Sequence, residues 1–307
     1  MTIMVGFRKI ISCIAVLFKT QTIPKKDWFW LFFSILFTTI KYPESLSRGG
    51  NYGKKTHFLS DYLPHPIKVK SPDGVLFIAR PKFEDLARFL FSSTVTKWEP
   101  ISLIKPKEND VVLGIGANIG YYTLRLASSV GKNGKVIAIE ADPESSKVLE
   151  NNCKLNKVQN VEIHNCAVTE KEGQIKLYQS STHSGINSIF ADVHGLDSNY
   201  VDVPAVKLDE LLGKRFQTID WIKIDVEGAE LSVLKGSEEI LKITKNILIE
   251  LHEDILKQNN ENPQTIIDIL KSNNFKITFL YKYWDEKTSR NKGLKYDYIF
   301  CEKRFSS

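Results

Sequence analysis

The hydrophobic and polar positions between residues 110 and 301 follow two alternating patterns. Short apolar runs bounded by polar residues predict buried strands, and segments with apolar positions every three or four residues predict helices. The predicted strands are Asp110–Gly114, Lys135–Glu140, Val161–Asn165, Ile219–Ile224 and Asn246–Leu251, and the predicted helices are Tyr121–Val130, Pro143–Asn156, Ala229–Ile243 and Pro263–Ser272. Because strands alternate with helices, we expect an α/β domain built on a mostly parallel sheet.

Two hairpins are predicted outside this alternation. Ile67–Lys70 and Val75–Ala79 flank a Ser-Pro-Asp-Gly turn, and a helix is expected to follow at Phe83–Phe91. Residues 174–206 predict an inserted β-hairpin with a long polar loop that is able to shape a substrate pocket.

The end of the chain distinguishes between two variants of such a sheet. Phe275–Leu280 and Tyr296–Cys301 are joined by a charged loop without a crossover helix, which predicts an antiparallel terminal strand. Nicotinamide-binding domains continue strand, helix, strand. The pattern therefore favours the Rossmann-like sheet of class I methyltransferases, which ends in an antiparallel hairpin.

Residues 1–66 differ from the rest of the chain and predict a helical N-terminal extension that ends in a Pro- and Gly-rich linker. Two apolar runs, Ile10–Phe18 and Trp28–Ile40, lie among basic residues. Neither reaches the roughly 20 residues of a spanning helix. The favoured interpretation is helices that cover a catalytic domain at 67–307. The alternatives are peripheral membrane contact through residues 8–40 and a signal or a span.

Charge and cysteine usage narrow the function classes. Residues 1–60 carry nine Lys/Arg and two Asp/Glu, whereas residues 61–307 carry 33 and 34. A near-neutral body argues against a nucleic-acid groove, so no nucleic-acid partner is expected. The four cysteines and six histidines fit no zinc, redox or metalloprotease spacing. We therefore expect reduced thiols, no metal site and a cytoplasmic location.

A glycine-rich loop, Gly114-Ile115-Gly116-Ala117-Asn118-Ile119-Gly120, follows the first strand of the alternating region. Ligands of an open α/β sheet bind beyond the carboxyl ends of the strands, beside this first strand. Glycines let the backbone approach a ligand, and amides at the next helix start bind a carboxylate. The spacing is G-x-G-x-x-x-G, so it fits a pyrophosphate less well than the dinucleotide pattern G-x-G-x-x-G does.

Glu140 ends the second predicted strand, about 20 residues after the last loop glycine. A carboxylate there accepts hydrogen bonds from both ribose hydroxyls of a nucleoside cofactor, and a solvated charge is the alternative. NAD-binding proteins share this residue type, so Glu140 indicates a ribose without naming the cofactor. Asn165 and Ala167, at the tip of the third strand, are positioned to border an adenine.

Four segments carry a more specific pattern. They are Gly-Ala-Asn-Ile-Gly-Tyr-Tyr-Thr at 116–123, Glu-Ala-Asp-Pro-Glu at 140–144, Val-Lys-Leu-Asp-Glu-Leu-Leu at 206–212 and Ile-Lys-Ile-Asp-Val-Glu-Gly-Ala-Glu at 222–230. With them, the chain resembles the FkbM family of S-adenosylmethionine-dependent methyltransferases from about Asp110 to Cys301. The resemblance implies S-adenosylmethionine as cofactor and O-methylation of a hydroxyl on a sugar, glycan, glycolipid or secondary metabolite.

An expected cofactor site is defined by the residues near the carboxyl ends of the predicted strands, together with the resemblance. Its residues are Gly114, Gly116, Asn118, Gly120, Glu140, Asp142, Asn165 and Ala167. One position departs from the family pattern, which has an acidic residue two places before Gly116, where this chain has Gly114. That acid orients the loop and holds the charged methionine end of the cofactor. Its loss is expected to weaken cofactor binding by about 1–3 kcal/mol.

Asp225 is the first candidate for a general base or a substrate-orienting carboxylate, because it ends the fourth strand at the cofactor's edge of the sheet. Lys223 shares its strand face and is expected to pair with it. Glu227, in the following turn, and His252, after the fifth strand, are the other catalytic candidates. The alternatives are a helix-start charge for Glu227, a surface position for His252, and a cation bound by Asp225 and Glu227.

Three other functions remain open from the residues alone. A noncatalytic S-adenosylmethionine-binding or scaffold protein is suggested by Gly114 and the apolar arm. An NAD-dependent oxidoreductase is disfavoured by the loop spacing and the antiparallel ending, and a nucleic-acid methyltransferase by the near-neutral body and by the lack of an Asn-Pro-Pro-aromatic motif. Tyr281, Tyr283 and Trp284 are candidates to stack on a sugar ring.

Overall fold

The computed structural model describes residues 66–71, 73–80, 100–180, 184–191, 199–280 and 298–304. The chain divides into two compact units, one of residues 1–99 with 180–185 and one of residues 100–179 with 186–307. The expected helix at 83–91, the apolar runs within 8–40 and the three loop aromatics lie outside the described residues. Among the described helices, none is long and apolar enough to cross a membrane.

The described part of the first unit contains the predicted hairpin. β1 (Ile67–Lys70) pairs antiparallel with β2 (Leu76–Ala79). Gly74 adopts a φ of 90° in the turn between them, a conformation that favours glycine. The Ser-Pro-Asp-Gly pattern therefore predicted this turn correctly, whereas the domain boundary near residue 67 remains a prediction.

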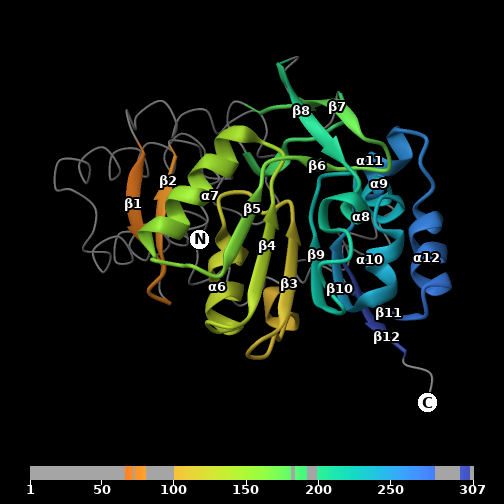
Figure 1. Cartoon of the computed structure of the whole chain (residues 1–307). Helices are drawn as coiled ribbons and strands as arrows, with labels where there is room; N and C mark the ends of the chain where they lie inside the picture. The colour runs from red at the N-terminus through yellow and green to blue at the C-terminus, as the bar shows by residue number, and fades with distance from the viewer. Residues whose placement is uncertain are drawn as a thin grey trace, which may run out of the picture. The chain divides into compact units, whose positions relative to one another are not determined.

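The second unit is built on a seven-stranded sheet with the order β11-β12-β10-β9-β3-β4-β5 (Figure 1). Its strands are β3 (Val111–Ile115), β4 (Lys135–Ile139), β5 (Val161–His164), β9 (Ile219–Ile224), β10 (Thr244–Glu250), β11 (Phe275–Leu280) and β12 (Tyr298–Lys303). β12 is antiparallel to β10 and β11, and the other neighbouring pairs are parallel. The predicted class I methyltransferase sheet with an antiparallel terminal strand is thus confirmed.

Helices pack on both faces of this sheet. They are α6 (Tyr121–Ser129), α7 (Pro143–Leu155), α8 (Leu208–Leu212), α9 (Glu230–Lys235), α10 (Glu238–Ile243), α11 (Glu253–Gln258) and α12 (Pro263–Ser272). Val112 and Val136 belong to a buried cluster with Leu126 of α6, whereas Leu113 belongs to a cluster with Leu234 of α9. Successive residues of a strand point to opposite faces of the sheet, and helices cover both faces. Each strand is therefore a continuous apolar run in the sequence.

The prediction of a single helix at 229–243 is wrong, because this segment forms two helices, α9 and α10, that are separated at Gly236. A Cβ at Gly236 would lie 2.2 Å from the carbonyl oxygen of Thr169, so only glycine allows this close approach of two backbones. The Ser237 hydroxyl donates to the carbonyl of Val233 at the break. The short helices α8 and α11 were not predicted either, since neither is long enough to show a helical period.

The insertion contributes β7 (Gly173–Tyr178) and β8 (Tyr200–Val206) to a separate small sheet. The preceding β6 (Ala167–Val168) completes this sheet, in the order β6-β8-β7. β7 and β8 are antiparallel, which confirms the predicted hairpin. Within the intervening loop, Ser188 forms a bridge with Tyr178. The Gln179 amide donates to the Asp142 carboxylate at 2.7 Å, so the insertion is attached to the start of α7.

Candidate active site

The loop after β3 requires glycine at two positions. Gly116 has a φ of 80°, and a Cβ there would lie 1.7 Å from the carbonyl oxygen of Asp225. Gly120, with a φ of 92°, precedes α6, and a Cβ there would lie 2.5 Å from the Leu149 side chain. The loop therefore packs closely against the end of β9 at Gly116 and against helix α7 at Gly120. Only residues without a side chain allow this geometry.

Gly114 has a different environment. It lies within β3, in register with Ala138 of β4 and Lys223 of β9, and its φ is not positive. An added Cβ would meet no atom within 4 Å. The backbone therefore does not require glycine at this position, and a Cβ, the first atom of the acidic side chain in the family pattern, fits there.

Glu140 joins the glycine loop to the end of β4. Its carboxylate accepts the backbone N–H of Asn118 at 2.6 Å and that of Asp142 at 2.9 Å. Asn118 itself adopts a φ of 48°, which directs its N–H toward this carboxylate. Two backbone donors from separate segments fix the orientation of the Glu140 side chain, which stays partly exposed. A carboxylate oxygen accepts more than one hydrogen bond, so capacity for a ribose remains.

The other three expected cofactor residues lie around this strand end. Asp142 is buried and caps α7, as predicted, by accepting hydrogen bonds from the backbone N–H and the hydroxyl of Ser145. Asn165 is exposed, and its amide donates to the carbonyls of Glu140 and Ala141. Ala167 is buried in β6. The Asp142 carboxylate is therefore occupied by structural bonds, and cofactor contact by these residues remains a prediction.

Asp225 follows β9 directly and is paired with Lys223. The Lys223 ammonium donates to Asp225 Oδ2 at 2.7 Å and lies 4.4 Å from the ring centroid of Tyr122. Lys223 is only 4% exposed. The predicted Lys223–Asp225 pair is therefore confirmed. A buried ammonium held by a carboxylate and an aromatic face fixes the position of that carboxylate.

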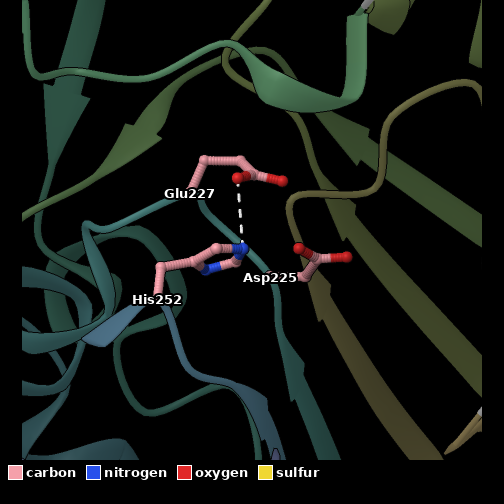
Figure 2. Close-up of side chains that lie close together, drawn as sticks. All are labelled: Asp225, Glu227 and His252. Atoms are coloured by element: carbon pink, nitrogen blue, oxygen red, sulfur yellow. Dashed lines mark ion pairs between the residues drawn. The ribbon is translucent and has the colours of Figure 1, made fainter. Parts of the chain in front are cut away.

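His252 lies between two glutamates at the end of β10. Its Nε2 lies 3.1 Å from Glu227 Oε2 (Figure 2). Its Nδ1 lies 2.8 Å from Glu230 Oε1. Burial lowers the pKa of His252, but the charges of Glu227 and Glu230 outweigh burial and raise this pKa well above 6.5. The side chain of His252 is 14% exposed, so the surface alternative is wrong.

The turn that carries Glu227 is held in an unusual conformation. Glu227 has a φ of 49°, outside the helix that follows. The hydroxyl of Ser188, from the insertion, donates to the Glu227 carbonyl at 2.8 Å. Asp225, Glu227 and His252 are thereby brought together, and each offers a ligand atom within 4.8 Å of the others (Figure 2).

Sequence reasoning missed two residues of this site. Glu230 is fully buried and accepts both the Gly228 N–H and the hydrogen bond from His252, although the sequence suggested no role for it. Its signal was an acidic residue among apolar positions in the first turn of α9. Ser188, which is 1% exposed, carries no recognisable signal, because it lies in a polar loop far from Glu227 in sequence.

Comparison with known proteins identifies the family of this chain. The family model of the methyltransferase FkbM domain matches residues 114–277, which is more than half of the chain. Methyltransferase sdnD of Sordaria araneosa is 26% identical over 59% of this chain and 80% of its own length. Methyltransferase 1 of Beauveria bassiana is 24% identical, over 47% of this chain and 65% of its own length.

The chain is also similar to a solved structure. The FkbM methyltransferase from Methylobacillus flagellatus is 18% identical, covers 71% of this chain with 52% of its own, and has a TM-score of 0.44. The chain thus spans about half the length of that protein. The predicted cofactor, S-adenosylmethionine, is confirmed as the cofactor of the family that the model defines. The chain belongs to the FkbM-domain family of methyltransferases.

Proposed function

We propose that this chain transfers a methyl group from S-adenosylmethionine to a hydroxyl of a sugar, glycan, glycolipid or secondary metabolite. One observation carries the proposal. The backbone of Asp225 lies against the glycine loop, since its N–H donates to Ile115 O at 3.0 Å and its carbonyl leaves no room for a Cβ at Gly116. The candidate base and the cofactor loop therefore meet at one point.

The residues present fit the cofactor. The loop amides and the glycine at 116 allow close approach of a ligand, and Glu140 presents an oriented carboxylate for the ribose hydroxyls. When bound, S-adenosylmethionine supplies an electrophilic methyl group on a sulfonium. The contribution of the chain is to align an acceptor oxygen with that methyl group, and such alignment lowers a barrier by several kcal/mol, up to about 7–11 in favourable cases.

Asp225 is a better candidate than His252 for accepting the hydroxyl proton. Both ring nitrogens of His252 face carboxylates, whose charges raise its pKa and favour the protonated form, which has no lone pair to accept a proton. Asp225 Oδ2 is bound to Lys223, and within the described part of the chain no hydrogen bond engages Oδ1. We therefore assign acceptance of the hydroxyl proton to Asp225. His252 instead stabilises the turn that carries Glu227, through its charge.

Calorimetric titration of S-adenosylmethionine into the wild type and Gly114→Asp tests the cofactor assignment. The wild type should bind, and Gly114→Asp should bind about tenfold more tightly, because the added carboxylate pairs with the charged methionine end. Gly114→Asn is the matched control of nearly equal volume without charge, and it should bind as the wild type does. Absence of binding in both the wild type and Gly114→Asp would overturn the proposal.

The acceptor class requires a separate experiment, because it rests on the family resemblance. Mass spectrometry of glycans, glycolipids and small metabolites from cells with and without the gene should show one species that is lighter by one CH2 unit without it, because a methyl group replaces a hydroxyl hydrogen. Release of S-adenosylhomocysteine with that species confirms turnover. Cofactor binding without any release favours the second candidate, a noncatalytic binding protein, which the glycine at 114 suggests.

Peripheral membrane contact through residues 8–40 is part of the same proposal, because a glycolipid acceptor would be presented at a surface. The basic surplus of residues 1–60 supports it. The full chain should co-sediment with vesicles that contain anionic lipid and remain in the supernatant with neutral vesicles. Equal recovery with both would argue for helices that cover the domain instead.

A further inference from the structure

We propose that Asp225, Glu227 and His252 form a binding site for a divalent first-row transition-metal ion. The inference deepens the proposed function, on which its catalytic part rests, whereas ion binding itself does not depend on that function. The three side chains come from two segments, the turn after β9 and the end of β10, and they face one another (Figure 2).

The distances suit a shared ion. Each residue offers one ligand atom, and these atoms lie within 4.8 Å of one another. Two ligands at about 2.1 Å from the same ion are at most about 4.2 Å apart, so small side-chain rotations are enough to close the site. Three protein ligands leave further coordination positions for water or an acceptor oxygen.

Glu230 supplies the second observation. It is fully buried, and its Oε1 lies 2.8 Å from His252 Nδ1, opposite the nitrogen that faces Glu227. Within the described residues, its buried Oε2 has no hydrogen-bond partner. A carboxylate behind a histidine is the usual outer partner of a metal-bound imidazole, because it fixes the tautomer and the direction of the other nitrogen. His252 Nε2 is therefore directed at the two acidic side chains.

The backbone holds these ligands before any ion arrives. Glu227 adopts its φ of 49° with the carbonyl bound by the Ser188 hydroxyl. At Gly228 a Cβ would lie 2.3 Å from the side chain of Ile255, so the turn is packed closely against α11. The position of Glu227 thus depends on tertiary contacts rather than on the local helix preference.

The charges favour a divalent ion. Asp225 and Glu227 together carry a formal charge of −2, and His252 coordinates an ion as a neutral imidazole. A divalent cation therefore makes the group of three ligands neutral. Lys223 and Glu230 stand behind the group as one positive and one negative charge, and they cancel each other. Neutrality matters here because the ligands are largely buried.

The donor set selects the class of ion. Two carboxylates suit Mg²⁺, Ca²⁺ and Mn²⁺, and an imidazole suits Fe²⁺, Ni²⁺ and Zn²⁺, so Mn²⁺ is the first-row transition metal whose preference matches the two carboxylates of the three ligands. Such an ion lowers the pKa of a coordinated acceptor hydroxyl. With the ion bound, the hydroxyl proton passes to solvent rather than to Asp225, the oxygen–carbon bond forms, and the carbon–sulfur bond breaks with its electron pair left on sulfur. Asp225 serves as a ligand in that state.

The experiment is a Mn²⁺ titration of the full chain, followed by electron paramagnetic resonance without cofactor. The wild type should bind a single Mn²⁺, and pulsed spectra should show coupling to a histidine nitrogen. Asp225→Asn and Glu227→Gln should weaken binding by about 10–100-fold. His252→Gln should abolish the nitrogen coupling. His164→Gln removes a histidine from the other Glu–His pair of this domain and should change nothing.

Circular dichroism checks that each variant is folded, and the two isosteric carboxylate variants decide the question if His252→Gln does not fold. No binding by the wild type, or equal affinity in all variants, would overturn the inference. If S-adenosylmethionine binds while Mn²⁺ does not, the proposed function stands without the metal. If Mn²⁺ binds while the cofactor does not, the site stands and the proposed function fails.

Discussion

Two Glu–His pairs in the same domain have opposite surroundings. Glu162 Oε1 lies 2.8 Å from His164 Nε2 on β5, and Glu227 Oε2 lies 3.1 Å from His252 Nε2 after β10. Glu162 also pairs with Arg215 at 2.7 Å and with Lys135 at 2.6 Å. The first pair is therefore rich in cations.

The second pair is rich in anions. His252 lies between two glutamates, and Asp225 offers a third carboxylate nearby. In the first pair, the hydrogen bond from Arg215 holds the pKa of Glu162 well below its usual value. In the second, the carboxylates raise the pKa of His252. The same two residue types therefore stabilise the fold in one setting and concentrate acidic groups beside the cofactor loop in the other.

The largest effect should come from Asp225→Asn, which removes the carboxylate that we assign as the proton acceptor beside the Glu227–His252 pair. We expect turnover to fall by about 10²–10⁴-fold, because the amide neither accepts a proton nor carries the charge. Release of S-adenosylhomocysteine with the identified acceptor measures this. Cofactor affinity, measured by calorimetry, should stay unchanged. Near-normal turnover would transfer the catalytic role to His252.

Glu230→Gln should produce the next largest effect, in the free energy of unfolding. The glutamine keeps its acceptor oxygen but loses the charge that faces the imidazolium, which should cost about 1–3 kcal/mol. Urea denaturation measures the difference, with Glu239→Gln on the exposed face of α10 as a near-neutral control. An unchanged unfolding midpoint would mean that the charge of Glu230 contributes nothing to the pair.

Glu162→Gln should cost about 1 kcal/mol, since it removes a partly exposed centre of three ion pairs. The folded-state pKa of Glu162 lies below 4.5, so its contribution is complete above that value and is lost as the pH falls through the folded pKa. The stability difference from the wild type should therefore be constant near neutral pH and shrink below about pH 4. A difference that grows on acidification would contradict this assignment.

His164→Gln should have the smallest effect, within about 0.5 kcal/mol, because Arg215 and Lys135 still neutralise Glu162. Thermal unfolding at neutral pH measures it. The same substitution type at position 252 should cost clearly more, since the buried Glu230 and the partly exposed Glu227 would then lose their cation. Equal effects at the two positions would remove the distinction between the pairs.

Much of the fold was predictable, because its signals are local. Apolar runs identified the core strands, Asp142 with the following proline identified the start of α7, and two-residue periodicity put Lys223 beside Asp225. The antiparallel terminal strand was predicted because no crossover helix lies between the last two predicted strands. No single residue indicated it. These features depend on neighbouring positions in the chain.

The parts that escaped prediction depend on contacts between distant segments. Glu230 and His252 are 22 positions apart, and their pairing requires the relative position of α9 and β10. The break at Gly236 is set by the approach of Thr169. The Ser188 contact with Glu227 depends on how the insertion folds back. A hydrophobic pattern carries no information about such contacts.

The two glycines that begin the loop should give opposite results in a saturation mutagenesis screen. At Gly116 any side chain collides with the Asp225 carbonyl, so every amino-acid substitution should be depleted, whatever the chemistry of the new residue. At Gly114 the open space should admit substitutions, and their enrichment should depend on charge. Position 114 is thus a natural starting point for directed evolution of cofactor affinity, whereas position 116 should stay fixed in every library.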